Sequence, residues 1–220
     1  MRNIVLRLFG VAVVTAAAAC GGTTGASAGT MPSSRDSTAE RAARADSVRS
    51  SYTPADVEFM TGMIHHHAQA LVMARMAPTH GASGSLQIMA ERIIVGQNDE
   101  ITLMQRWLQE QNQPVPEPGS PDMAAHGEEH AMHMPGMLSA EQLEELGAAR
   151  GPEFDRIFLT YMIQHHQGAI TMVEELFGSG GAQGDAIFKL ASDIAADQSS
   201  EIARMQSMLR EMLFEPVSSP

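Results

Sequence analysis

The sequence contains very little cysteine and few aromatic residues. Cys20 is the single cysteine among 220 residues, which excludes a disulfide framework and a cysteine-based zinc site. Phe, Trp and Tyr together make up 5% of the chain, and this scarcity disfavours an all-β sandwich. No apolar run reaches the roughly 20 residues that a membrane-spanning helix needs. The formal charge of −12 argues against nucleic-acid backbones as partners, because phosphate binding needs a basic surface.

Methionine is abundant where the aromatic residues are scarce. The chain has 17 Met against one Trp and two Tyr. A core with so few rings must be filled by aliphatic side chains and by flexible thioethers.

The start of the chain predicts export. Residues 1–19 combine Arg2 and Arg7 with an apolar stretch of small residues, as in a secretory signal peptide. The small residues before Cys20 resemble a bacterial lipobox. We therefore predict a lipid anchor on Cys20 of a cell-envelope protein that faces the periplasm or the exterior; the alternative is plain cleavage with a free thiol. Residues 20–52 are mostly small and polar and predict a flexible tether.

The rest of the chain is a tandem repeat. Two blocks recur, the first at an offset of 99 residues and the second at an offset of 101, as in the pairs Asp56/Asp155, Phe59/Phe158, Met63/Met162, His66/His165, His67/His166, Met73/Met172, Ile93/Ile194, Gln97/Gln198, Glu100/Glu201 and Met104/Met205. Two copies of a helix–loop–helix unit are the simplest interpretation. One hairpin cannot hide its own apolar stripe, so we expect an all-α, antiparallel four-helix bundle built from two hairpins.

Helix caps and Pro or Gly breaks divide this region into segments. We expect the first helical hairpin at 53–112, a linker at 113–138, a short helix at 139–151, the second hairpin at 152–214 and a tail at 215–220.

Each copy places a histidine pair beside methionine on one helix face. At about 100° per residue, Met63, His66 and His67 share the buried face, whereas His65 lies on the opposite, exposed side. The second copy has Gln164 at the position of His65. The predicted metal ligands are the inward His and Met side chains of both copies: Met63, His66, His67, Met73, Met162, His165, His166 and Met172.

The partner helix of each copy carries polar residues inside its apolar stripe. A buried carboxylate needs a partner, and the inward histidines are the obvious ones. The candidates for additional ligands, or for groups that support the ligands, are Gln97, Glu100, Met104, Gln198, Glu201 and Met205.

The linker between the copies is rich in histidine and methionine. Its candidate metal ligands are Met123, His126, His130, Met132, His133, Met134 and Met137. Thioether and imidazole together select copper, above all Cu(I). The alternative interpretations are a polar linker without a metal and, for the helices, methionine and histidine that only fill the core.

The repeated F-x-x-x-M-I-x-H-H motif, the MPGM turn and the F-D-x-x-F-L-x-x-M-I-x-H-H-Q-G-A run resemble the domain of unknown function 305 (DUF305) family. The resemblance covers about Pro54 to Leu213. It implies a ferritin-like four-helix bundle, commonly exported, in a family with copper-binding members. The family motif carries over to the inward His and Met residues of both copies.

The sequence favours an exported, lipid-anchored copper-binding protein that sequesters the metal, confers resistance or passes the metal on. A ferritin-like redox enzyme with another metal is one alternative, but each copy lacks the inward Glu-x-x-His pair of di-iron sites. A purely structural or adaptor bundle is another. The expected partners are a metal ion and, through the anchor alone, a membrane; a homodimer or a copper-transfer partner stays open.

Overall fold

The computed structural model describes residues 52–118 and 134–214. This part of the chain is all-α and contains no strand; its elements are α2 (Pro54–Ala74), the short 3-10 helix η1 (Ala77–Thr79), α3 (Gly84–Glu110), α5 (Ala140–Ala148), α6 (Pro152–Gly178) and α7 (Asp185–Phe214). None of these helices is both long and apolar enough to cross a membrane. The predicted signal peptide, Cys20, nearly all of the tether, the tail after residue 214 and five tract residues lie outside the described residues; the five are Met123, His126, His130, Met132 and His133.

Local sequence signals set the helix ends. Thr53 caps α2 in a capping box with Asp56, and a proline follows at the first helical position. Ser139 forms the same kind of box at the start of α5. Helix α2 ends at Ala74, and the chain continues into η1, which contains Pro78.

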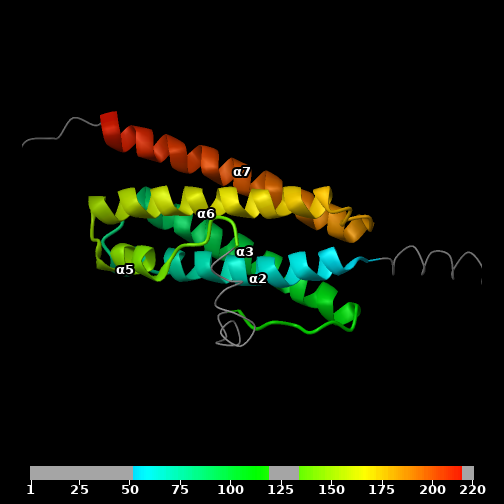
Figure 1. Cartoon of the computed structure of the whole chain (residues 1–220). Coiled ribbons are helices and arrows are strands. Elements are labelled where there is room, and N and C mark those ends of the chain that lie inside the picture. Colours follow the sequence, from blue (N-terminus) through cyan, green and yellow to red (C-terminus); the bar gives the residue numbers. More distant parts are fainter. Residues whose placement is uncertain (1–51, 119–133, 215–220) are drawn as a thin grey trace, which may run out of the picture. The chain divides into compact units, whose positions relative to one another are not determined.

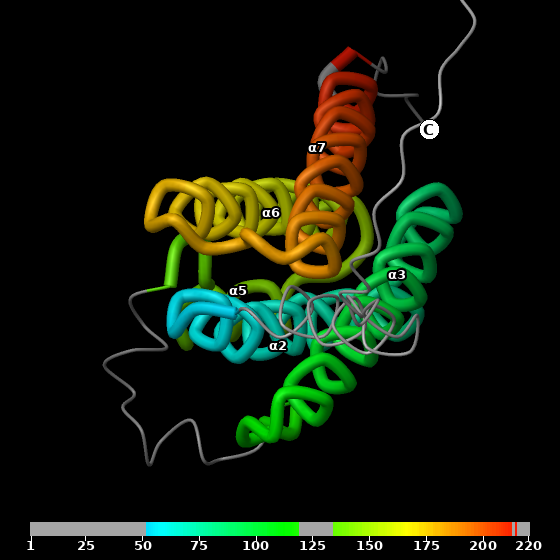
Figure 2. Tube along the Cα trace, turned by 90° about the vertical axis from the view of Figure 1, so that its right-hand side faces the viewer, coloured from blue at the N-terminus to red at the C-terminus, as the bar shows by residue number. Residues whose placement is uncertain are grey.

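The long helices form two hairpins that meet through their first members. Helix α2 packs against α3, α6 packs against α7, and α2 packs against α6. Figure 1 shows that α2 and α6 lie side by side and run in opposite directions. Figure 2 shows α3 beside α2 and α7 beside α6. The middle of α2 therefore faces the middle of α6.

Two buried aspartates form hydrogen bonds between the two copies. Asp56 at the start of α2 accepts a hydrogen bond of 2.6 Å from the backbone N–H of Ala182, in the loop of the second hairpin. Asp155 at the start of α6 accepts bonds of 3.1 and 3.2 Å from the N–H of Ser83, in the loop of the first hairpin. Both carboxylates are buried. The reciprocal bonds explain why aspartate occurs at the same position in both copies.

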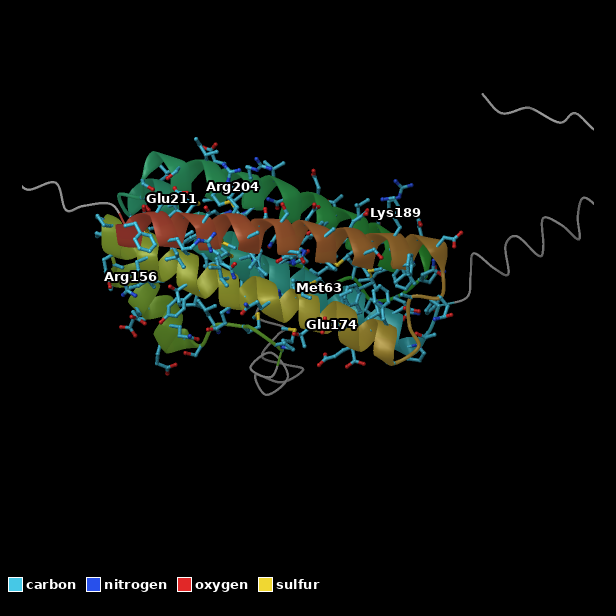
Figure 3. All side chains as sticks on the ribbon, turned by 90° about the horizontal axis from the view of Figure 1, so that it is seen from above. Met63, Arg156, Glu174, Lys189, Arg204 and Glu211 are labelled. Atoms are coloured by element: carbon cyan, nitrogen blue, oxygen red, sulfur yellow. The ribbon has the colours of Figure 1, made fainter. Side chains whose placement is uncertain are left out.

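The interior consists of two apolar clusters on either side of a polar layer. One cluster joins the first half of α2 to the second half of α6, and the other joins the second half of α2 to the first half of α6. Histidine and glutamine side chains occupy the buried positions between them. Figure 3 shows Met63 within the bundle, while Lys189 and Arg156 extend outward from their helices. Buried polar side chains in such a position require an explanation.

Candidate metal centre

His66 and His165 meet at the centre of the bundle. Their ring centroids are 3.8 Å apart, with an angle of 38° between the ring planes. Both side chains have an exposed fraction of 0%. The two rings occupy matching positions in the two copies, so the α2–α6 contact brings equivalent residues together.

Three of the four ring nitrogens in this pair have no hydrogen-bond partner. The Nε2 of His66 lies 3.0 Å from the carbonyl oxygen of Pro135; because a carbonyl only accepts, this nitrogen carries the proton. The Nδ1 of His66 therefore has a free lone pair. Both ring nitrogens of His165 lack a partner. Buried nitrogen atoms without hydrogen bonds are rare, and they are the atoms with which histidine binds metals.

Burial keeps both rings neutral. Loss of solvent, reinforced by His67, lowers the pKa of His66 to about 3 despite the opposing bond to Pro135. Loss of solvent, reinforced by His66, likewise places the pKa of His165 well below its usual value of 6.5. At neutral pH no proton competes for the free lone pairs, and neutral imidazole is the form that ligates a metal.

The neighbouring histidines have different surroundings. The Nε2 of His67 bonds to Glu100 at 2.7 Å, and the Nε2 of His166 bonds to Glu201 at 2.7 Å. The histidine side chains are fully buried, but those of Glu100 and Glu201 are 12% and 23% exposed. The expected contact of inward histidine with carboxylate is present, although these carboxylates are more exposed than the sequence suggested. Each carboxylate fixes its ring in one orientation.

Methionines lie on both sides of the central pair. Met63 and Met172 belong to one apolar cluster, whereas Met73 and Met162 belong to the other. Met104 and Met205, on α3 and α7, are also fully buried, one in each cluster. The thioethers predicted as ligands therefore divide into two sets, which the repeat relates to each other.

The MPGM turn, residues 134–137, closes over one side of this centre. Its Pro135 carbonyl accepts the bond from His66. The side chain of Gln69 forms two hydrogen bonds with Leu138, the residue after the turn. Its amide oxygen accepts from the Leu138 N–H at 2.8 Å, and its amide nitrogen donates to the Leu138 carbonyl at 3.0 Å. The turn lies directly on Gly168 of α6, where a Cβ atom would approach the Pro135 oxygen to 1.9 Å. Only glycine permits this contact.

The turn also brings a linker thioether to the helices. The Met134 sulfur lies 3.6 Å, and the Met172 methyl 3.4 Å, from the position that a Cβ on Gly62 would occupy. Met137, which is partly buried, belongs to the same turn. The rest of the predicted tract lies outside the described residues.

Sequence reasoning missed Gln69 and Gly168. These two residues occupy equivalent positions in the copies, at the same offset as the histidines. A glutamine in one copy and a glycine in the other is a difference within an otherwise well-matched block. This difference was the available signal that something asymmetric packs there.

The prediction that His65 is exposed was wrong. Its side chain is only partly exposed, its Nδ1 is buried without a partner, and burial lowers its pKa. The reason is that α2 packs against both α3 and α6, so its covered arc is wider than one stripe. Gln164, the equivalent residue in the second copy, is also partly buried.

Carboxylates do not gather around an ion position in residues 52–118 and 134–214. In these residues no group of three or more His, Cys, Asp or Glu side chains is placed to hold a metal ion.

These features define an all-α protein with a buried, methionine-flanked histidine pair between two repeated hairpins. The chain belongs to the DUF305 family, whose domain model matches residues 56–209. No protein in a search of the curated proteins matches the chain.

Several solved structures are similar to this chain. A DUF305 fragment from Deinococcus radiodurans is 31% identical, with a TM-score of 0.62, over 73% of this chain and 98% of that one. A predicted secreted DUF305 protein from Streptomyces coelicolor is 25% identical, with a TM-score of 0.61, over 72% and 92%. CopM in a Cu(II)-bound form is 31% identical, with a TM-score of 0.58, over 71% and 96%. CopM has also been solved with Cu(I) and with silver.

Proposed function

We propose that this protein is an exported copper-binding protein whose metal centre is built on His66 and His165. The observation that carries the proposal is the stacked, fully buried histidine pair with three unpartnered ring nitrogens. The protein sequesters copper, confers resistance or passes the metal on. The other proposed partners are a membrane, through the anchor, and a second protein that receives the metal.

The chemistry of the surrounding side chains fits copper. Neutral imidazole binds both oxidation states of copper, and thioether sulfur favours Cu(I). Met63 and Met172 supply sulfur on one side of the pair, and Met73 and Met162 supply it on the other. Met134 adds a thioether from the turn. Oxygen-rich cages suited to Ca²⁺ or Mg²⁺ would use different ligands.

A purely structural role explains this centre poorly. A buried nitrogen without a hydrogen bond costs about 1–3 kcal/mol, so a leucine pair would stabilise the helix contact better than two histidines. Each ring of the neighbouring pair has one carboxylate partner and one unpartnered Nδ1, so fewer of its nitrogens are left without a bond. The similarity to CopM, solved with Cu(I), Cu(II) and silver, supports copper as the ligand.

We assign the supporting roles as follows. Glu100 and Glu201 orient His67 and His166, which complete the centre or stabilise its walls. The linker tract offers copper a first binding position outside the core, and Met134 connects this tract to the centre.

The four long helices constitute a ferritin-like bundle, and the lipid on Cys20 holds the protein at the cell envelope. The similarity to a predicted secreted protein supports export.

Copper titration tests the proposal. The full chain is titrated with Cu(I) against a chromophoric chelator, as wild type and as the double variant His66→Leu/His165→Leu. We expect the variant to lose about a hundredfold or more in affinity for the bundle site, since even groups that only orient a ligand contribute 10–100-fold. An unchanged affinity, with the helical circular dichroism also unchanged, would show that copper binds elsewhere.

A further inference from the structure

A pocket of about 200 Å³ lies between α3 and α7. The copper proposal uses only two of its lining residues, Glu100 and Glu201, to orient histidines, and it places nothing in the pocket itself. Its lining is polar. Glu100, Asp197 and Glu201 contribute carboxylates, Gln97 and Gln198 contribute amides, and Arg92 contributes a guanidinium. Helices α3 and α7 come from different copies, so the pocket combines equivalent residues of both.

The pocket carries an excess of negative charge. Three carboxylates face one guanidinium, which leaves two negative charges without a counter-charge in the lining. A cation in the pocket would relieve this repulsion.

Two buried amides in the lining have unused hydrogen-bonding atoms. The Gln97 side chain is 2% exposed, and neither its amide oxygen nor its amide nitrogen has a partner. Gln198 is 1% exposed, and its amide oxygen has no partner. Apolar residues would fill these positions without unmet hydrogen bonds. The free amide oxygens indicate that the pocket holds a hydrogen-bonding occupant.

The size of the pocket favours a cation that retains its hydration shell. The carboxylates are not placed to grip a bare ion within the described part of the chain. The volume of about 200 Å³ is far larger than a bare ion, however, and leaves room for water molecules around a cation. Mg²⁺ and similar hard divalent ions retain most of their hydration shell in proteins. We propose that this pocket binds a hydrated divalent cation of the Mg²⁺ or Mn²⁺ class, through hydrogen bonds from its waters to these carboxylates and amides.

Mn²⁺ is the probe for the test. The copper-free full chain, labelled with ¹⁵N, is titrated with Mn²⁺ at constant ionic strength, and the paramagnetic broadening of backbone resonances is followed. We expect broadening centred on residues 92–100 and 197–201, reversed by excess Mg²⁺. Broadening spread over the acidic surface, or centred on the buried histidines, would overturn the proposal.

Two variants and one matched control sharpen the test. Asp197→Asn removes one charge at an exposed position and should weaken Mn²⁺ binding about fivefold, the effect of one charge near a protein surface. Gln97→Met removes the amide at similar volume and should weaken binding at least twofold. Asp99→Asn removes the same charge from α3 outside the pocket and should change binding less than twofold. Equal effects of Asp197→Asn and Asp99→Asn, or none from the two pocket variants, would contradict the assignment.

Discussion

The two histidine pairs are adjacent in sequence but differ in the partners of their ring nitrogens. His66 and His165 face each other and leave three ring nitrogens free. His67 and His166 each bond a carboxylate on the partner helix of their own hairpin through Nε2, and each leaves its Nδ1 without a partner. One residue along a helix turns the side chain by about 100°. That rotation separates a ring that faces the other hairpin from a ring that bonds a carboxylate within its own hairpin.

In the polar layer, each ring of His67 and His166 has one bonded nitrogen, whereas the two central rings have only one bonded nitrogen between them. The His67–Glu100 and His166–Glu201 bonds satisfy one nitrogen of each ring within each hairpin. The central pair has no such arrangement between hairpins and relies on the Pro135 carbonyl for one bond. A metal ion between the hairpins would use the lone pairs that the central rings keep.

The largest expected effect is a dependence of stability on pH that comes from the central pair. In the folded protein the pKa of His66 is lowered to about 3 and that of His165 is well below 6.5. The unfolded rings take up protons near pH 6.5, but the folded rings do not. The free energy of unfolding of the metal-free protein therefore falls as pH drops below 6.5, by up to about 1.4 kcal/mol per pH unit for each ring.

Urea unfolding between pH 7 and pH 4 measures this dependence. The double variant His66→Leu/His165→Leu supplies the control, because it retains all carboxylates and the other histidines. Its stability should fall less steeply over the same range. Equal slopes in the two proteins would mean that the central rings are protonated in the folded state.

The second prediction removes the partner of the other pair. Glu100→Leu and Glu201→Leu each leave a buried imidazole without its carboxylate and should lower the free energy of unfolding by about 1–3 kcal/mol. Affinity for Cu(I) should fall by about tenfold, the lower end for a group that orients a ligand and well short of the loss in the central double variant. The exposed Glu110→Leu serves as a control for loss of charge on α3. A loss of copper affinity as large as that of the central double variant would place His67 or His166 in the copper site.

The third prediction concerns the turn. Gly168→Ala should displace the MPGM turn, since its Cβ would lie 1.9 Å from the Pro135 oxygen. The displacement withdraws Met134 and frees the His66 Nε2, and we expect about a tenfold loss of Cu(I) affinity, at the lower end for a group supporting a ligand. Gly147→Ala is the matched control, because nothing lies within 4 Å of the added atom. Equal copper affinity in the two variants would exclude the turn from the site.

The smallest effect is expected at His65. His65→Gln installs the residue that the second copy already has at Gln164, which occupies an equally half-buried position. Stability should change by no more than about 0.5 kcal/mol, because the glutamine side chain already fits the equivalent half-buried position and removes no bonded group. Cu(I) affinity should also be preserved. A loss comparable to that of the central pair would contradict the division of the histidines by face.

The all-α fold and its hairpins could be predicted because their signals are local. Proline at the start of α2 and α6, and the 3.6-residue spacing of apolar side chains, set the helices. The repeat then implied that the two hairpins pack on each other. The end of α2 was harder to predict, because η1 continues the chain in a tighter coil through Pro78.

The candidate site could be predicted only in part. The helical wheel identified which residues face inward, and Glu100 and Glu201 were sensible partners for buried histidines. The helical wheel could not show that His66 meets His165 across the bundle, because that contact depends on the packing of α2 on α6. The position of the MPGM turn could not be predicted either, because it depends on the absence of a side chain at Gly168.

The most direct test of the account is X-ray absorption spectroscopy of the protein loaded with one equivalent of Cu(I). The full chain is used with the tract residues Met123, His126, His130, Met132 and His133 replaced by Ser, so that copper in the linker does not contribute. The account predicts a first shell that contains both imidazole nitrogen and thioether sulfur, and the loss of the imidazole contribution in His66→Leu/His165→Leu. A shell of sulfur alone, or one that is identical in the double variant, would contradict a copper centre built on His66 and His165.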